Sequence, residues 1–126
     1  MKIEKANKDL VEMAVLGDFS PKYTVRVYQE GGPTPHFHID NKQTGESCCV
    51  RIDKAEYFNH EKHMTKFLTA KLKKNLVDWL NSNSSDYSIL NINLTLYQNI
   101  CILWNQNNPN WKLEKIPDMP NYLEIE

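Results

Sequence analysis

Three segments in the first half of the chain alternate apolar and polar residues, and turn-forming residues separate them. The segments are residues 22–29 (KYTVRVYQ), 36–40 (HFHID) and 47–53 (SCCVRID), and the connections contain GGPTP and NKQTGE. Glycine permits positive φ, and proline disfavours helix in the residue before it. Alternation with a period of two buries one face of each strand. We therefore predict a three-stranded antiparallel meander.

The same alternation assigns side chains to the two faces of the predicted sheet. Phe37 and Ile39 should point into the core, whereas His36, His38 and Asp40 should point away from it. In the last strand, Cys48, Val50 and Ile52 alternate with Cys49, Arg51 and Asp53. A histidine face therefore lies opposite the core.

The second half of the chain has helical periodicity. Thr69 is a suitable N-cap for a helix that ends near Leu80, with an apolar stripe facing the sheet. Ser85 or Asp86 is a suitable N-cap for a longer helix that ends near Trp104. The apolar surface of this longer helix is broad, which indicates burial on two sides, by the rest of the domain or by a second subunit.

These elements predict an α+β fold, in which a small antiparallel sheet of three or four strands is packed by two C-terminal helices. The 126 residues suffice for a single domain, 1–126, with its core at about 22–111. LVEMAVLGDF, in the first twenty residues, fits either a short helix or a strand. The proline-containing tail after Asn105 is predicted to cross the surface as an extended arm.

Composition excludes several classes of protein. The 15 basic and 16 acidic side chains nearly cancel, so no cationic field favours nucleic acid, and we expect none to bind. No apolar run is long enough for a membrane span, and the polar start is unlike a signal peptide. Three cysteines, two of them adjacent, suit reduced thiols better than a disulfide framework. We therefore expect a cytoplasmic location without membrane association.

His36 and His38 are candidate metal ligands. Histidines at i and i+2 on a strand project from the same face, and Cys49 or Asp53 could supply a third ligand. The alternative is two imidazoles that hydrogen-bond to backbone or carboxylate groups. His60 and His63 occupy a polar segment whose spacing defines no geometry, so we predict that both are surface residues.

The segment WNQNNP near the end of the longer helix also permits two interpretations. Asparagine tolerates the left-handed conformation and bonds to nearby backbone, so Asn105 and Asn108 would close the helix. Alternatively, their amides would join His36, His38 and Arg51 in a polar binding surface. We favour the helix cap and keep these five residues as the candidate surface.

The order of motifs, Tyr28, then PHFH, then CCVRIDKAEYF, then LVDWL, then WNQNNP, resembles a group of small bacterial proteins of unknown function. That group has a Pro-His-Phe-His motif after a short strand and a Trp-Asn pair near the C-terminus, and the similarity covers about residues 22–111. Many members carry an Asp-His step where this chain has Glu30, Gly31 and Gly32. The resemblance implies a compact α+β domain, often encoded near mobile-element or toxin-antitoxin genes.

The sequence favours a non-catalytic interaction or accessory module, with a protein partner or a second copy and without a cofactor, and the resemblance adds an antitoxin-like role as one form of such a module. No catalytic signature or glycine-rich phosphate loop is present in it. The alternative is a metal-dependent hydrolase or nuclease, in which His36, His38 and a third ligand hold a divalent transition metal.

Overall fold

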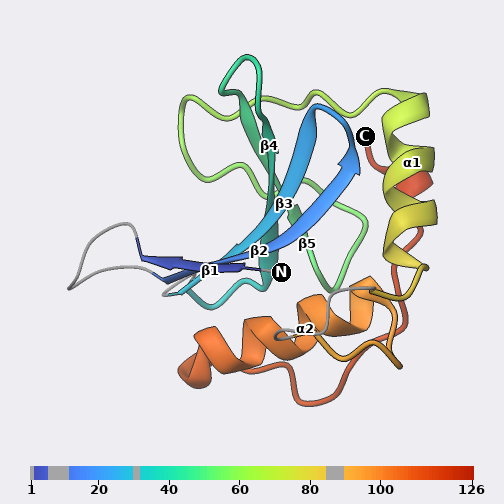
Figure 1. Cartoon of the computed structure of the whole chain (residues 1–126). Coiled ribbons are helices and arrows are strands. Elements are labelled where there is room, and N and C mark those ends of the chain that lie inside the picture. The colour runs from blue at the N-terminus through green and yellow to red at the C-terminus, as the bar shows by residue number, and fades with distance from the viewer. Residues whose placement is uncertain (1, 6–11, 30–31, 85–89) are drawn as a thin grey trace.

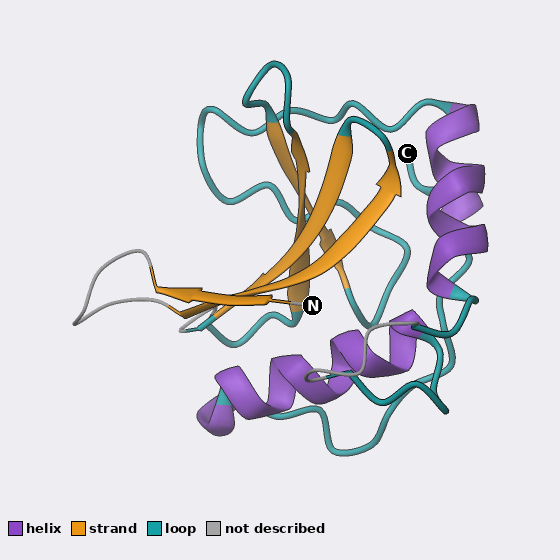
Figure 2. Cartoon of the chain, in the orientation of Figure 1, coloured by secondary structure: helices purple, strands orange, loops and turns teal. Residues whose placement is uncertain are grey.

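The computed structural model describes residues 2–5, 12–29, 32–84 and 90–126. A single antiparallel sheet contains β1 (Lys2–Lys5), β2 (Glu12–Ser20), β3 (Tyr23–Tyr28), β4 (His36–Asn41) and β5 (Ser47–Arg51), in that order. Two α-helices among the described residues, α1 (Ala70–Leu80) and α2 (Leu96–Asn107), lie beside the curved sheet (Figures 1 and 2). The predicted α+β class is confirmed. β3, β4 and β5 form the predicted meander, and β2 and β1 extend it.

The core lies between one face of the sheet and the two helices. Val25 and Val27 of β3 and Phe37 and Ile39 of β4 are fully buried there, as the alternation predicted. Helix α1 packs against β2, and α2 packs against β2 and β3. The helices contribute these buried side chains: Leu76, Leu80, Leu96, Tyr97, Ile100, Cys101, Leu103 and Trp104.

The turn between β4 and β5 sets the register that builds the candidate site. The Asn41 side-chain oxygen accepts hydrogen bonds from the backbone N–H groups of Gln43 and Thr44. Gly45, at φ +78°, closes the turn by donating to the Asn41 carbonyl. Glycine adopts this left-handed conformation without the steric cost that a Cβ atom brings. The turn residues seen in the sequence therefore determine which β5 side chain faces each β4 side chain.

Helix α1 begins and ends where the sequence predicted. The Thr69 hydroxyl oxygen accepts a hydrogen bond from the backbone N–H of Leu72 at 3.2 Å, which is N-cap geometry. The ambiguous N-terminal segment is a strand over its described part, β2.

The prediction for the start of the longer helix was wrong. Helix α2 begins at Leu96, with Thr95 and Gln98 forming a capping box, while residues 90–95 form a turn. Asn91 and Asn99 explain the difference, because the Asn99 side chain accepts from the Asn91 N–H at 2.8 Å and donates to its carbonyl at 3.0 Å. Such local bonds compete with helix. The predicted N-caps, Ser85 and Asp86, lie outside the described residues.

The C-terminal arm does more than cross the surface. The arm contains the short 3-10 helices η1 (Pro109–Trp111) and η2 (Tyr122–Glu124), and its end enters the core, where Tyr122, the first residue of η2, and Ile125, the residue after η2, are buried. The Tyr122 hydroxyl donates to the Arg51 carbonyl at 2.6 Å, and the Lys73 ammonium donates to the Ile125 carbonyl. The arm is therefore an integral part of the fold. Within the described residues, neither helix has the length and apolar character that a membrane span requires.

Candidate metal centre

Cys49 is brought to the histidine face by the pairing of β4 with β5. His38 and Cys49 are directly opposite each other in the ladder, and His36 is opposite Arg51. Side chains of directly opposed residues lie close together on one face of a sheet. The face that carries His36, His38 and Cys49 is the one turned away from Phe37 and Ile39, as predicted.

His60 reaches the same place because the segment that follows β5 folds back along this strand. The backbone N–H of Phe58 donates to the Cys49 carbonyl at 2.8 Å, and the Cys49 N–H donates to the Asn59 side chain at 2.8 Å. At the far end of the segment, the Thr65 N–H donates to the Ser47 carbonyl at 2.9 Å. These bonds hold residues 58–65 over the histidine face.

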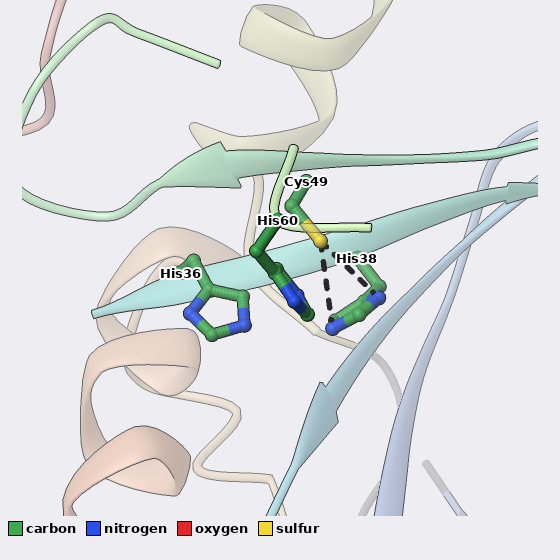
Figure 3. Close-up of side chains that lie close together, drawn as sticks. All are labelled: His36, His38, Cys49 and His60. Carbon is green, nitrogen blue, oxygen red and sulfur yellow. Dashed lines mark hydrogen bonds between the residues drawn. The ribbon is translucent and has the colours of Figure 1, made fainter. Parts of the chain in front are cut away.

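His36, His38, Cys49 and His60, here called the His3Cys cluster, each offer one ligand atom, and these atoms all lie within 4.8 Å of one another. Figure 3 shows the His60 ring beside the rings of His36 and His38, with the Cys49 sulfur directed at His38. The His60 ring centre is 5.2 Å from that of His36 and 5.8 Å from that of His38.

The distances in the cluster are close to those of a tetrahedral metal site. Zinc bonds of about 2.0–2.1 Å to nitrogen and 2.3 Å to sulfur place a nitrogen and a sulfur ligand about 3.6 Å apart. Cys49 Sγ lies 3.5 Å from His38 Nε2 and 3.3 Å from its Nδ1. This pair therefore has the separation of two ligands on one ion, and all ligand atoms of the cluster lie within 4.8 Å of one another.

Burial keeps two imidazoles of the cluster, those of His36 and His38, neutral. His36 is 3% exposed, and desolvation lowers its pKa despite the opposing effect of the Thr34 hydrogen bond. Desolvation also lowers the pKa of His38 to about 3, with smaller contributions from His36 and His60. Neutral imidazole is the form that binds metals. These two histidines are thus in the ligand state at neutral pH.

Burial shifts the pKa of the Cys49 thiol in the opposite direction, upward. It is fully buried, and desolvation, with a smaller effect of Cys48, raises the pKa of its thiol far above the usual range. A buried thiol without a cation is a poor nucleophile, which argues against a Cys-His catalytic pair. A bound metal ion would supply the positive charge that displaces the thiol proton.

One hydrogen bond selects the free nitrogen of His36. Its Nδ1 lies 2.8 Å from the Thr34 carbonyl oxygen, which can only accept, so Nδ1 carries the proton. Nε2 is then the nitrogen with a free lone pair. Metal-binding histidines in proteins commonly have this second contact, which fixes ring orientation and tautomer. The contact comes from the Pro-Thr-Pro turn that precedes β4.

Aromatic rings enclose the buried side of the cluster. The His36 ring lies 5.4 Å from the Trp104 ring and 5.1 Å from the Phe58 ring, and His38 lies edge-on to Tyr28 at 4.5 Å. Trp104 also donates from Nε1 to the Trp111 carbonyl at 2.9 Å. The end of α2 is thereby fixed against the histidine face.

The other side of the cluster lines a pocket of about 480 Å³. Glu61 and His63, both exposed, stand at this pocket, with the Glu61 carboxylate 3.2 Å from His63 Nε2. The lining outside the cluster includes Tyr28, Gln29, Ser47, Glu61, His63 and Met64. A metal in the cluster would be reachable from solvent through this pocket.

The two candidates for a third ligand lie in different places. Cys49 belongs to the cluster, whereas Asp53 accepts two hydrogen bonds of 2.9 Å from the Arg51 guanidinium. Asp40, on the same face of β4, pairs with Arg26 at 2.8 Å and accepts a hydrogen bond from Ser47. Both carboxylates are therefore engaged outside the cluster.

Asn105 and Asn108 make structural contacts with backbone groups. Asn108 Nδ2 donates to the Tyr28 carbonyl at 3.1 Å and to the Trp104 carbonyl at 3.2 Å, joining the end of α2 to β3. The Asn105 side-chain oxygen accepts from the Leu113 N–H at 2.7 Å. Neither lines the pocket beside the cluster. The wider binding surface that includes them stays a prediction.

His60 is the site residue that the sequence assigned to the surface. Its side chain is 35% exposed, yet one ligand nitrogen belongs to the cluster, while His63 is 68% exposed and outside it. No local pattern could have separated these two histidines. The available signal was the apolar pair Tyr57 and Phe58, since Tyr57 bridges to Val50 of β5 and begins the return of the chain.

Comparisons of this chain with protein-family models, with curated proteins and with solved structures found no match. The resemblance to the Pro-His-Phe-His group therefore stays a prediction.

Proposed function

We propose that this chain binds one transition-metal ion in the His3Cys cluster, at the base of the pocket. The observation that supports this most is the convergence of four donor atoms within 4.8 Å, from two strands and a loop. An exposed acidic group is common without a metal, but three imidazoles around a buried thiol are not an ordinary surface arrangement.

The energetics of burial also support a metal. Among the described residues, the hydrogen-bond partner of the His38 ring nitrogens is the Cys49 sulfur, which is a weak donor and acceptor. Burying a polar ring without a strong partner is costly. His38 is half-buried and lines the pocket, so a metal ion would give both it and Cys49 a stronger partner than they give each other.

Cobalt(II) titration of chelator-treated protein, kept reduced and anaerobic, tests the proposal. We expect visible bands of tetrahedral cobalt and a near-ultraviolet band from thiolate-to-cobalt charge transfer, both complete at about one equivalent. Cys49→Ser should abolish the charge-transfer band, and Cys48→Ser is the matched control that should keep it. A folded wild-type protein without either band would overturn the proposal.

Metal-dependent hydrolysis is a second candidate, which Glu61 favours. Its exposed carboxylate lines the pocket and contacts His63 at 3.2 Å, so it could accept a proton from a metal-bound water. For this reaction, His60 must not bind the metal, so that a water molecule can take the fourth coordination position. Turnover of phosphoester or carboxylic ester substrates by the zinc-loaded chain, lost in Glu61→Gln with zinc still bound, would support it. Full activity in that variant would exclude Glu61 as the base.

The non-catalytic interaction module expected from the sequence stays a prediction. A bound metal does not require catalysis, so both properties can belong to the same protein.

A further inference from the structure

Met64 lies against the His3Cys cluster without belonging to the core. Its Sδ is 3.6 Å from Cys49 Sγ, and its half-buried side chain lines the pocket. By contrast, Met119 packs against the described hydrophobic core, where a thioether serves as an adaptable filler. Core packing therefore explains the position of Met119 but not that of Met64.

The backbone around Met64 directs its sulfur to the cluster. The Met64 N–H donates to the Glu61 carbonyl at 3.2 Å, which closes a turn, and the next residue, Thr65, is bonded to Ser47 of β5. The same segment delivers His60. One return of the chain thus brings both an imidazole and a thioether to Cys49.

The chemistry of this donor set discriminates among metals. Thioether is a soft, uncharged ligand that selects Cu(I), whereas zinc takes thiolate, imidazole and carboxylate. A site with imidazole, cysteine thiolate and a nearby, weaker methionine sulfur has the ligand composition of copper centres. Met64, Cys49 and the imidazoles together provide that composition.

The charge of the site also favours Cu(I) over a divalent ion. Cu(I) and the Cys49 thiolate form a neutral pair, but a divalent ion would leave one positive charge among buried groups. Uncompensated buried charge is costly. Arg26, directly opposite His38 on β3, is already paired with Asp40 at 2.8 Å, so this carboxylate is engaged and does not offset the charge of a divalent ion.

We propose that the metal is copper, bound as Cu(I) by Cys49 and imidazoles of the cluster, with Met64 Sδ as a further ligand. This inference rests on the proposed function, because it names the metal of the same site. Binding replaces the Cys49 thiol proton, which passes to solvent, and the copper keeps its oxidation state throughout.

The experiment compares two metals on two matched variants of the full chain. Cu(I) affinity is measured anaerobically by competition with a chromogenic Cu(I) chelator, and zinc affinity by competition with a chromogenic zinc chelator. The variants are Met64→Leu and the control Met119→Leu, since leucine conserves the volume of methionine and lacks the sulfur. Circular dichroism confirms that each variant is folded.

The expected result is that Met64→Leu weakens Cu(I) binding about tenfold or more while zinc affinity changes less than about twofold. Met119→Leu should leave both affinities unchanged. If Met64→Leu leaves the Cu(I) affinity unchanged, or lowers the affinities for Cu(I) and zinc equally, Met64 is not a copper ligand. The proposed metal site itself would then still stand. Failure of wild-type protein to bind either metal would overturn the metal site itself.

Discussion

Cys49 lies directly opposite His38 in the β4–β5 ladder, with its Sγ 3.5 Å from His38 Nε2. Cys48, its neighbour in sequence, belongs to the hydrophobic core on the other face of β5, where burial raises its thiol pKa to about 12. Two adjacent buried cysteines therefore lie in different surroundings, one in the hydrophobic core and one beside histidines. This pair provides a matched test of the site.

Cys49→Ala is expected to remove the stabilisation by metal, whereas Cys48→Ala is expected to keep it. Zinc at about 100 times its dissociation constant should raise the free energy of unfolding of wild type by about 2.7 kcal/mol. Cys48→Ala should lower the metal-free stability by about 1 kcal/mol, because it removes a buried sulfur. Denaturant unfolding with and without zinc measures both quantities. An equal zinc increment in Cys49→Ala would contradict the assignment of this ligand.

Zinc binding is expected to release about one proton per ion at pH 8. The lowered pKa values of His36 and His38 mean that these rings have no proton to lose, whereas the raised pKa of Cys49 keeps its thiol protonated. Calorimetry in buffers of different ionisation enthalpy measures the number of protons released per zinc ion. Release close to zero would show that the thiol is not a ligand.

The tautomer of His36 is a third expectation. Because Nδ1 donates to the Thr34 carbonyl, zinc should bind Nε2, and Nδ1 should remain protonated. Nitrogen-15 NMR of labelled histidine distinguishes the two nitrogens before and after zinc addition. A metal-induced change at His36 Nδ1 in place of Nε2 would refute the role assigned to Thr34.

The Arg51–Asp53 pair is expected to make stability depend on acid pH. Hydrogen bonding by Arg51 lowers the pKa of Asp53, so the ion pair stabilises the fold above the unfolded pKa of about 3.9 and is lost as pH falls through the folded value. Unfolding free energy should thus fall less from about pH 5 to 3 in Asp53→Asn than in wild type, by no more than about 1 kcal/mol. Glu56→Gln is the control, since Glu56 is 3.8 Å from the same guanidinium and more exposed. A wild-type slope in Asp53→Asn would contradict the linkage.

The C-terminal arm is expected to contribute to stability through Tyr122. Tyr122→Phe removes the donor to the Arg51 carbonyl and should cost about 1–2 kcal/mol of unfolding free energy. Leu123→Ala, at a position 51% exposed, should change it by less than about 0.5 kcal/mol. Thermal or denaturant unfolding compares the two. Equal costs would show that the arm is not anchored by this hydroxyl.

Much of the sheet could be predicted, because its signals are local. Alternation placed Phe37 and Ile39 in the core and His36 and His38 on the opposite face, and Thr69 marked the start of α1. Each of these inferences needed only neighbouring residues. The register that pairs Cys49 with His38 was harder to predict, since the alternation put Cys49 and Asp53 on the same face of a strand predicted to span residues 47–53, whereas β5 ends at Arg51.

The remaining features depend on contacts between distant segments. The Asn91–Asn99 pair holds residues 90–95 in a turn, although the N-cap candidates Ser85 and Asp86 predicted that the helix would already include them. His60 joins the cluster only because residues 58–65 bond to β5. Burial of Tyr122 likewise depends on a partner 71 residues earlier in the chain. Periodicity carries no information on such long-range bonds.

The metal content of reloaded protein decides whether the His3Cys cluster holds an ion. Protein without a histidine tag is stripped with a chelator, exposed to excess zinc, passed through a desalting column and analysed for elements, beside His36→Ala and His38→Ala. The account predicts near-stoichiometric zinc in wild type and its loss in both variants, with circular dichroism confirming that they are folded. Wild type that retains neither zinc nor, after the same reloading with Cu(I), copper would contradict a metal centre in the His3Cys cluster, and so would folded variants that retain as much zinc as wild type.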